Sequence, residues 1–349
     1  MCSKTGNLAA SGVVLADDAT GALECASVLA DLGLDVALTL EAEPQVRRGI
    51  LVADTESRHL LAAEAGRRMA RWSLCTAAIF KKTDSTLRGN IAAELLALLS
   101  RGPLVYVPAY PKLGRTVQDG RLLVKGIPVH QTEFACDALH PVRSSIVADL
   151  FPAGSAVSIR DAKQLACFLA LGEVKVAICD AASDEDLQAI AESLRGEEVT
   201  VAGPSGFIGH WASLRTFARM SPATVPVVSN WLVVCGSRHP QSRRQAHLAG
   251  RSGLTVLLST PEELSPEAAA TELARRAVKL IPRGTAGVVV MGGDTAWALW
   301  RALGISHLTP LPEVLPGVAA CFSGDLLFVT KAGGFGEDDL VTRIMERFV

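Results

Sequence analysis

Apolar and polar positions follow two alternating patterns along the chain. Short runs rich in Val, Ile and Leu, such as residues 12–16 and 287–291, are separated by longer stretches in which Ala and Leu recur at helical spacing. Strands that are apolar on both sides are typical of parallel sheets covered by helices. The pattern therefore predicts an α/β protein built of mostly parallel sheets flanked by helices.

The predicted strands are short and the predicted helices fill most of the intervals between them. The expected strands are 12–16, 35–40, 49–53, 76–81, 104–108, 174–179, 199–202, 231–235, 255–258, 287–291 and 326–330. The expected helices include 21–32, 57–73, 92–99, 184–194, 267–280 and 295–303. Residues 108–141 show neither period, and a connection of this length is expected to be a binding loop.

Length and one proline-containing stretch divide the chain into two domains. The chain has 349 residues, 49% of them apolar, which is enough for two packed cores. Residues 220–228 contain two prolines and little charge pattern, as interdomain connections do. We expect one domain over residues 1–225 and a second over residues 226–349, with a ligand cleft between them.

The charge balance narrows the classes of partner. With 34 basic and 36 acidic residues, the formal net charge of −2 gives no electrostatic reason to expect nucleic acid or a membrane surface as a partner. Charge or glycine interrupts every apolar run before the ~18 residues of a membrane span, and no signal sequence is visible. The eight cysteines include no C-x-x-C pair, which fits reduced thiols. We expect a cytoplasmic protein with small-molecule partners, and formation of a homodimer stays open.

Two adjacent aspartates, Asp17 and Asp18, follow the first expected strand. In doubly wound sheets, ligands bind beyond the carboxyl ends of the strands. One carboxylate can cap the next helix and have only a structural role. The alternative is that one aspartate binds or deprotonates a substrate hydroxyl while the other caps the helix.

Residues 81–90, with the sequence KKTDSTLRGN, concentrate hydrogen-bonding groups after another expected strand. A helix cap explains one of these groups, Asp84 or Asn90, but not the rest. Arginine binds carboxylates through two parallel hydrogen bonds, so Arg88 points to a small acid as ligand. Arg115 and Thr116 follow a proline-containing turn and add donors for an anionic or hydroxylated ligand.

Three glycine-containing turns follow expected strands in the C-terminal part. They are Gly236-Ser237, the sequence GGDT at 292–295 and the sequence KAGGFG at 331–336. Glycines allow a phosphate to approach the backbone, and the following helix N-terminus favours negative charge. Capping by Asp294 or Thr295 explains one such turn, whereas three favour a phosphate-containing ligand.

Several common catalytic and nucleotide-binding sites are excluded because their motifs are absent from the sequence. The sequence has no P-loop, no G-x-G-x-x-G after a strand, no protein-kinase catalytic loop and no G-x-S-x-G. The seven histidines lack the spacing of a transition-metal site, so we expect no metal-ligand set, and Mg²⁺ would arrive with phosphate.

In order and spacing, five segments resemble the four-carbon acid sugar kinase family: ADDATGA at 16–22, KTDSTLRGN at 82–90, PAYPKLGRT at 108–116, GGDT at 292–295 and KAGGFG at 331–336. The resemblance covers nearly the whole chain. It implies an enzyme of carbohydrate metabolism, a phosphotransferase with an alcohol group as acceptor. Its N-terminal domain would bind a sugar acid and its C-terminal domain would bind ATP with Mg²⁺. The terminal hydroxyl of threonate, erythronate or 3-oxo-tetronate would accept the phosphoryl group.

Motif matching and the residue patterns together give the candidate site. The candidate catalytic residues are Asp17, Asp18 and Lys331; the candidate substrate-binding residues are Asp84, Ser85, Arg88 and Arg115; the candidate ATP-binding residues are Ser237, Gly292, Gly293, Asp294, Thr295, Gly333 and Gly334. The chain departs from the family at the residues after Gly236-Ser237, at Asp294, where the family has Glu, and at Gly334, where Asn is usual.

Two alternatives stay open because of these departures. The protein could be a kinase for another sugar acid, or a sensor that binds sugar acid and nucleotide without catalysis. A dehydrogenase is less favoured, since the sequence has no dinucleotide-binding fingerprint.

Overall fold

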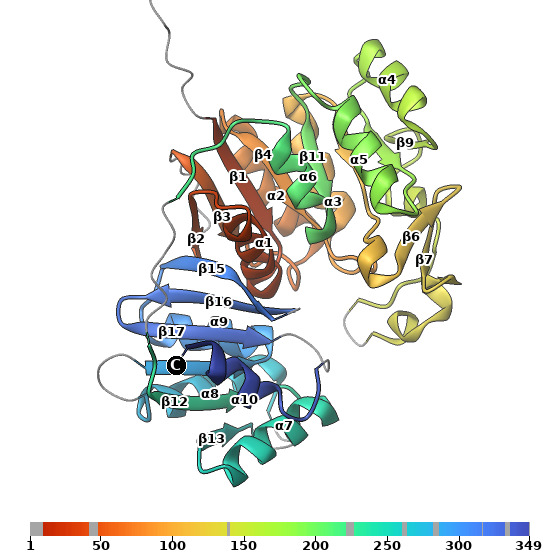
Figure 1. Ribbon diagram of the computed structural model, residues 1–349. Helices are drawn as coiled ribbons and strands as arrows, with labels where there is room; N and C mark the ends of the chain where they lie inside the picture. Colours follow the sequence, from red (N-terminus) through yellow and green to blue (C-terminus); the bar gives the residue numbers. More distant parts are fainter. Residues whose placement is uncertain are drawn as a thin grey trace, which may run out of the picture. The chain divides into compact units, whose positions relative to one another are not determined.

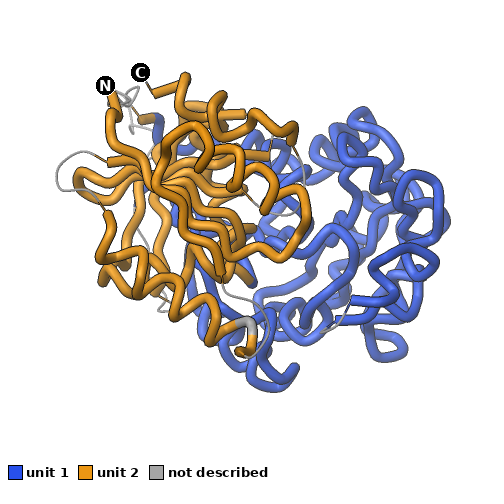
Figure 2. The backbone as a smooth tube through the Cα atoms, turned by 90° about the horizontal axis from the view of Figure 1, so that it is seen from below, with its two compact units in different colours: residues 1–17, 42–219 blue, residues 18–41, 220–349 orange. Residues whose placement is uncertain are grey.

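The computed structural model describes residues 10–41, 48–137, 140–220, 227–259, 264–281, 286–315, 317–331 and 336–348. The chain forms two compact units, shown in Figure 2: unit 1 comprises residues 1–17 and 42–219, and unit 2 comprises residues 18–41 and 220–349. Residues 18–41 therefore belong to unit 2, although they precede most of unit 1 in the chain. The expected domain boundary between residues 225 and 226 lies outside the described residues.

Unit 1 is built on parallel strands flanked by helices, as Figure 1 shows. Its strand order is β3-β1-β4-β11-β5-β10-β9, and every neighbouring pair is parallel. The strands are β1 (Ser11–Ala16), β3 (Gly49–Asp54), β4 (Ala78–Lys82), β5 (Leu104–Tyr106), β9 (Ala156–Ile159), β10 (Val176–Cys179) and β11 (Thr200–Gly203). Parallel pairing brings the carboxyl ends of β1 and β4 to the same edge, so the segments that follow these strands are neighbours.

Two of the unit 1 helices begin at a residue whose side chain caps them. The unit 1 helices are α2 (Ala62–Ala70), α3 (Ile91–Leu98), α4 (Ala162–Leu171), α5 (Asp184–Ser193) and α6 (Ile208–Ser213), with 3₁₀ turns at Arg71–Leu74, Leu99–Arg101, Pro111–Leu113, Val129–Gln131, Glu133–Cys136, Val147–Leu150 and Ser205–Phe207. Ser183 and Asp186 form a reciprocal capping box at the start of α5. The Asp161 side chain caps α4 by accepting a hydrogen bond from the Gln164 amide.

The segment 108–141 contains more regular structure than its sequence pattern predicts. It includes β6 (Arg115–Gln118), β7 (Arg121–Val124) and β8 (Ile127–Pro128), which form a small antiparallel sheet. Both turns of this sheet have positive φ, at Asp119-Gly120 and at Lys125-Gly126. Such turns connect hairpins, and an Asp-Gly pair is a known hairpin signal. The expectation of an irregular loop was therefore wrong for this part.

Unit 2 combines parallel and antiparallel strands in the order β13-β12-β14-β17-β16-β15-β2. The strands are β2 (Val36–Thr39), β12 (Asn230–Cys235), β13 (Thr255–Leu258), β14 (Ala286–Met291), β15 (His307–Leu315), β16 (Val318–Ser323) and β17 (Leu326–Lys331). The first four in this order pair in parallel, and β16, β15 and β2 continue the order through antiparallel pairs. The helices are α1 (Ala19–Asp31), α7 (Pro240–Arg251), α8 (Pro266–Val278), α9 (Gly293–Ala302) and α10 (Leu340–Met345), followed by a 3₁₀ turn at Glu346–Phe348.

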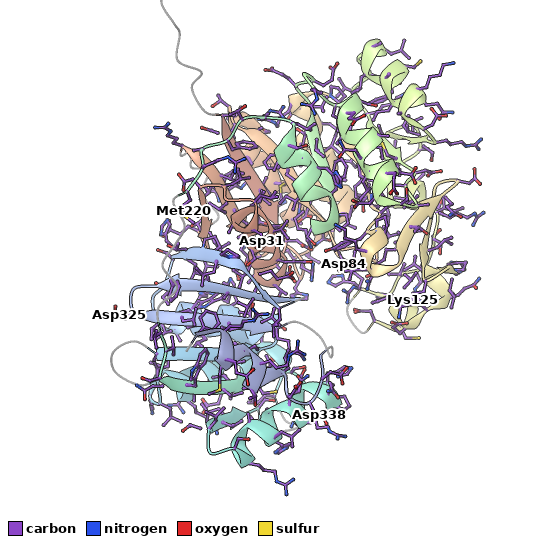
Figure 3. All side chains as sticks on the ribbon, in the orientation of Figure 1. Asp31, Asp84, Lys125, Met220, Asp325 and Asp338 are labelled. Carbon is purple, nitrogen blue, oxygen red and sulfur yellow. The ribbon has the colours of Figure 1, made fainter. Side chains whose placement is uncertain are left out.

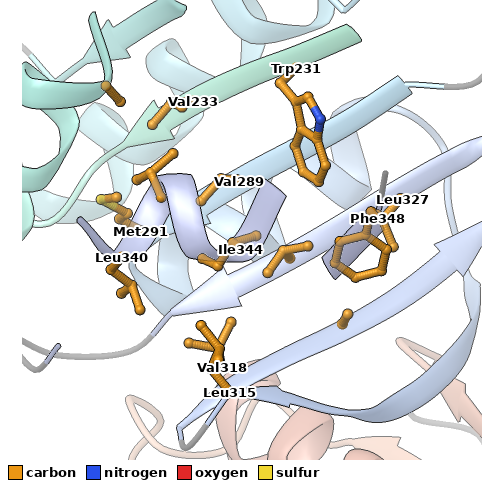
Figure 4. Packing of buried hydrophobic residues seen from close by; sticks show 14 of the residues in the cluster. Trp231, Val233, Val289, Met291, Leu315, Val318, Leu327, Leu340, Ile344 and Phe348 are labelled. Atoms are coloured by element: carbon orange, nitrogen blue, oxygen red, sulfur yellow. The ribbon is translucent and has the colours of Figure 1, made fainter. Parts of the chain in front are cut away.

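Alternate side chains of the unit 2 strands form the core shown in Figure 4. Val233, Val289 and Val329 stand side by side in register on neighbouring strands, and all three are fully buried. They pack in one cluster with Ala246 of α7 and Ile344 of α10. The intervening strand residues are buried as well, which explains why these strands read as continuous apolar runs.

Each predicted strand and helix has a counterpart in the structure, with ends shifted by a few residues. The largest shift concerns α2, which was expected over residues 57–73 and begins only at Ala62. Ser57 and Arg58 are held outside the helix because their amides donate hydrogen bonds to the Asp17 carbonyl. None of the helices in the described segments has the length and the apolar run needed to span a bilayer.

Candidate active site

The two aspartates after β1 have different environments. Asp18 caps α1, because its Oδ1 accepts a hydrogen bond from the Gly21 amide at 2.8 Å. Asp17 is buried, with 2% of its surface exposed, and Arg58 donates to both of its carboxylate oxygens, from Nε at 2.8 Å and from Nη2 at 3.0 Å. Asp18 is therefore the helix cap, and Asp17 is a buried charged group whose contact with a substrate hydroxyl stays a prediction.

Arg58 is a site residue that the sequence patterns did not reveal. It lies in the segment between β3 and α2, and its amide and that of Ser57 donate to the Asp17 carbonyl at 3.2 and 3.1 Å. Its guanidinium also approaches Asp84, with Nη2 4.0 Å from Oδ1. Arg58 thus lies between two buried carboxylates that come from different strands.

Asp84 organises the turn between β4 and α3, and it is labelled in Figure 3. Its Oδ2 accepts hydrogen bonds from the Thr86 amide at 2.9 Å and from the Thr86 hydroxyl at 2.5 Å. Arg88 donates to Asp84 through Nη2 at 2.8 Å and through Nε at 3.2 Å. Gly89 has φ +87°, and a Cβ there would lie 3.2 Å from Asp17 Oδ2, so a glycine lets this turn approach Asp17 closely.

Arg88 also connects this turn to the long segment after β5. Its Nη1 donates to Asp137 Oδ2 at 3.2 Å, and its guanidinium carbon lies 5.3 Å from the centre of the Phe134 ring. Asp137 in turn accepts a hydrogen bond from the His140 amide at 2.8 Å. Asp17, Arg58, Asp84, Arg88 and Asp137 form a continuous polar group, which we call the acid cluster.

Electrostatics keep the buried carboxylates of the acid cluster ionised. Burial alone would raise the pKa of Asp17, but the charges of Arg58 and Lys81 outweigh this effect and lower the pKa to about 2. Burial likewise opposes ionisation of Asp84, yet Arg88 and Arg58 hold its pKa well below the usual range. These carboxylates can therefore accept hydrogen bonds from ligand hydroxyls, while the guanidinium groups carry compensating charge.

Two other expected substrate-binding residues, Ser85 and Arg115, have fewer contacts with the acid cluster. Ser85 is half-buried in the turn directly after Asp84. Arg115 begins β6, and its Nη1 donates to the Leu113 carbonyl at 2.9 Å. Among the described residues, no hydrogen bond or ion pair joins Arg115 to the acid cluster. The structure thus brings Asp17, Asp84 and Arg88 together and leaves Arg115 bonded within its own hairpin.

In unit 2, backbone hydrogen bonds join the ends of β12, β14 and β17. The amides of Gly236 and Ser237 both donate to the Met291 carbonyl at 3.0 Å, and the Gly292 amide donates to the Lys331 carbonyl at 3.1 Å. A Cβ on Gly236 would lie 1.8 Å from Thr295 Oγ1, so only glycine fits there. Gly236, Ser237, Gly292, Gly293, Thr295 and Lys331 form what we call the glycine-turn cluster.

Lys331 brings positive charge to the glycine-turn cluster. Only 1% of its surface is exposed, and its Nζ donates to Ser242 Oγ at 2.9 Å. Burial lowers the pKa of Lys331 to about 8. An ammonium group beside the first turn of α7, where Ser242 lies, is suited to phosphate oxygens. Asp294 is exposed in the first turn of α9, and the expected residues Gly333 and Gly334 lie outside the described residues.

Thr20 of α1 lies against the same cluster and was not among the expected site residues. A Cβ on Gly293 would lie 2.1 Å from its Oγ1, so α1 and the N-terminus of α9 are in direct contact. The sequence could not reveal this contact, because the two residues lie more than 270 positions apart (293 − 20 = 273).

The polar groups of the glycine-turn cluster are backbone amides, hydroxyl groups and one ammonium group. In the described part of the chain, no group of three or more His, Cys, Asp or Glu side chains is placed to hold a metal ion. Mg²⁺ commonly keeps waters and binds mainly through substrate phosphates, so these residues fit a magnesium ion that enters with ATP.

Comparison with known proteins gives two matches, the first of which also covers residues 18–41, although these belong to unit 2 in the structure. A family model described as a sugar-binding N-terminal domain matches residues 12–211, and one described as a nucleotide-binding C-terminal domain matches residues 262–341. The acid cluster lies in the first match. Gly292, Gly293, Thr295 and Lys331 lie in the second.

Curated relatives resemble the chain over most of its length. A D-threonate kinase of Bordetella bronchiseptica is 31% identical, over 95% of this chain and 95% of the relative. A D-erythronate kinase of Heliobacterium modesticaldum is 34% identical over 56% of this chain and 51% of the relative. A 3-oxo-tetronate kinase of Burkholderia multivorans is 24% identical over 95% and 96%, respectively.

Two solved structures share the fold. A Haemophilus influenzae protein superimposes with a TM-score of 0.74 at 21% identity, over 97% of this chain and 100% of that one. A Bordetella bronchiseptica domain, solved as a domain-swapped dimer with bound citrate, gives a TM-score of 0.52 at 28% identity over 97% and 98%. With two matching domains and a relative of 31% identity across the whole length, the chain belongs to the four-carbon acid sugar kinase family.

Proposed function

We propose that this protein transfers the γ-phosphoryl group of ATP to the terminal hydroxyl of a four-carbon sugar acid of the threonate, erythronate or 3-oxo-tetronate type. Its family makes it a phosphotransferase that acts on a sugar acid. The observation that carries the finer proposal is the acid cluster, where two ionised, buried carboxylates and two guanidinium groups meet beyond the ends of β1 and β4.

The acid cluster offers groups for both ends of a hydroxy acid. Ionised Asp17 and Asp84 accept hydrogen bonds from sugar hydroxyls, and Arg88 binds the substrate carboxylate. A carboxyl with a pKa of about 2 is a weak base at neutral pH. Asp17 therefore orients the attacking hydroxyl rather than removing its proton in advance, which suits phosphoryl transfer, where positioning and charge stabilisation dominate.

The glycine-turn cluster offers groups for the phosphates. The Gly293 amide at the start of α9 and the ammonium of Lys331 provide donors and positive charge, while the Gly236 and Ser237 amides hold the turn in place by donating to the Met291 carbonyl. Mg²⁺, when bound with ATP, neutralises phosphate charge. Gly292 has φ +117°, which favours glycine, and the absence of a side chain on Gly293 lets Thr20 Oγ1 approach the backbone of this turn.

Release of ADP, measured with threonate, erythronate and 3-oxo-tetronate in both enantiomers, tests this function. We expect acid-dependent ADP release with one or more of these acids. Acid binding without turnover would instead favour the sensor, and turnover only with longer acids would favour another sugar-acid kinase.

The Arg88→Ala variant tests the role of the acid cluster within that activity. Charged hydrogen bonds contribute about 1.5–3 kcal/mol, so the KM for the acid should rise roughly tenfold to a hundredfold. The KM for ATP should stay nearly constant. An equal rise of both KM values would contradict the assignment of Arg88 to the substrate carboxylate.

A further inference from the structure

A buried ion pair lies next to the acid cluster, and the mechanism above uses only the effect of its Lys81 charge on the pKa of Asp17. Lys81 of β4 is fully buried, and Glu94 of α3 is 1% exposed. The Lys81 Nζ lies 3.0 Å from Glu94 Oε2 and also donates to the Lys82 carbonyl at 2.8 Å. Removing two charges from water costs free energy that their attraction only partly offsets. Stabilisation of the fold alone therefore does not explain the pair.

Hydroxyl groups connect this ion pair to the backbone of the acid cluster. Glu94 Oε1 is hydrogen-bonded to Ser57 Oγ, and Ser57 Oγ lies 2.8 Å from Thr55 Oγ1. Thr55 Oγ1 donates to the Ala16 carbonyl at 2.7 Å. All of these side chains are buried.

The ends of this network coincide with the two halves of the Asp17–Arg58 ion pair. Ala16 precedes Asp17 in the chain, and Ser57 precedes Arg58. The amides of Ser57 and Arg58 also donate to the Asp17 carbonyl. Any shift of Ser57 would therefore move the Arg58 backbone relative to the carboxylate that it binds.

We propose that Lys81 and Glu94, acting through Ser57 and Thr55, are positioning residues that fix Asp17 and Arg58 for the reaction. This inference rests on the proposed function. In this role the network contacts neither the acid nor ATP. It fixes the positions of the groups that bind the acid. Misplacing reacting groups by about 1 Å can lower a rate about a hundredfold, so interrupting the network should act mainly on kcat.

Variants that cut the network at its hydroxyl groups test the proposal. Ser57→Ala removes the connection to Glu94, and Thr55→Val removes the hydroxyl that donates to the Ala16 carbonyl while keeping the side-chain shape and the amide that donates to the same carbonyl at 2.8 Å. We expect kcat to fall roughly tenfold to a hundredfold in both, with the KM for ATP within about twofold. Thr55→Ser keeps the hydroxyl and should retain most of the activity.

A matched control separates positioning from a general loss of packing. Ile91→Val shortens a buried side chain of α3 that belongs to no part of the network. It should leave kcat nearly unchanged. The proposal is overturned if Ser57→Ala and Thr55→Val reduce kcat no more than Ile91→Val does, or if Thr55→Ser loses as much activity as Thr55→Val.

A measurement without catalysis keeps this inference separate from the proposed function. Hydrogen exchange of the Ser57 and Arg58 amides should accelerate at least tenfold in Ser57→Ala and Lys81→Met, and stay unchanged in Ile91→Val. If the wild-type protein turns over none of the acids, the proposed function fails while this exchange experiment still decides whether the network fixes the segment. Unchanged exchange in both variants would sink the positioning role.

Discussion

At the scale of single residues, contacts with distant parts of the chain distinguish two neighbouring side chains of the same type. Asp17 and Asp18 are neighbours of the same type, and the sequence predicted that one would be a cap. The position of Asp18 before the helix favoured it as the cap, but Arg58, the partner of Asp17, was not predicted because it lies 41 positions away in the chain. Glu94 and Asp137 escaped notice for the same reason, since they meet the site only through contacts between distant segments.

Substitutions at the two aspartates should separate capping from function. Asp18→Ala should lower the free energy of unfolding by about 1 kcal/mol, and Asp18→Ser should restore it, because serine caps helices equally well. Both variants should keep kcat within a few-fold. Urea denaturation and steady-state kinetics measure these effects, and a large loss of kcat in Asp18→Ser would show that Asp18 does more than cap α1.

Asp17→Asn should behave differently, because it leaves Arg58 half-buried without its carboxylate partner. Breaking a buried pair in this way costs about 3–5 kcal/mol of stability. We expect kcat to fall at least about a hundredfold in protein that circular dichroism shows to be folded. A folded Asp17→Asn variant with kcat close to that of the wild type would rule out Asp17 as the group that orients the hydroxyl.

Lys331 should give the protein a pH dependence above neutrality. Its pKa is lowered from 10.5 to about 8 in the folded state, so between these values the unfolded chain holds a proton that the folded chain has lost. The contribution of Lys331 to the free energy of unfolding therefore rises as the pH rises from about 8 to about 10.5. Conversely, kcat/KM for ATP should fall above about pH 8, as the ammonium charge is lost.

The variants Lys331→Arg and Lys331→Met isolate this effect. The arginine variant keeps its charge and should lose the alkaline fall in kcat/KM for ATP, whereas the methionine variant should have a low value at every pH. A wild-type profile that stays flat to pH 10 would contradict a role for the Lys331 charge in ATP binding.

At the scale of elements, continuous apolar runs predicted the parallel strands except β9, and among the antiparallel strands they predicted β2 but missed β15, β16 and the small sheet. The hairpin of β15 and β16 was not expected, because Pro310 and Pro312 interrupt the strand pattern of β15. The small sheet β6-β7-β8 was hidden by glycine turns that resemble an irregular loop. Hydrophobic periodicity identifies strands that are buried on both faces. It is less informative for short strands that pair with the next strand in the chain.

The contact between α1 and α9 is an element-level feature that a double-mutant cycle can measure. Gly293→Ala places a Cβ against Thr20 Oγ1 and should cost about 1–3 kcal/mol of unfolding free energy. Adding Thr20→Ala removes the clashing atom, so the double variant should recover most of this loss. Thermal or urea unfolding gives the coupling energy, and strictly additive effects would mean that the two residues do not meet.

A second glycine provides the control for this cycle. Gly250 lies inside α7, and a Cβ there would make only an ordinary contact, 3.4 Å from Val256. Gly250→Ala should therefore stabilise the protein by about 0.5–1 kcal/mol, since alanine favours helices over glycine.

At the scale of the whole molecule, the two compact units are not two consecutive parts of the chain. α1 and β2 belong to unit 2, where β2 pairs with β15 and α1 packs against β15 and α9. Leu23 and Leu29 of α1 are fully buried. Sequence composition alone predicts a boundary in the proline-containing stretch near residue 225. It cannot show that a helix early in the chain packs in the unit formed by the later residues.

Fragments of the chain test this assignment. A fragment of residues 226–349 lacks α1 and β2, so it should unfold without a cooperative transition or aggregate. Joining residues 18–41 to its N-terminus through a flexible linker should restore cooperative thermal unfolding, measured by circular dichroism. Equal melting temperatures for the two fragments would show that α1 and β2 are dispensable for unit 2.

The early position of α1 and β2 also has a consequence for synthesis on the ribosome. These elements precede most of unit 1 in the chain, yet β15, the strand partner of β2, begins 266 residues after residue 41 (307 − 41). At roughly 5–20 residues per second, the apolar face of α1 waits roughly 13 to 50 seconds for its partner. In the nascent chain, α1 therefore stays without its unit 2 partners while most of unit 1 is translated. We expect chaperones that shield apolar segments to bind this protein during that interval.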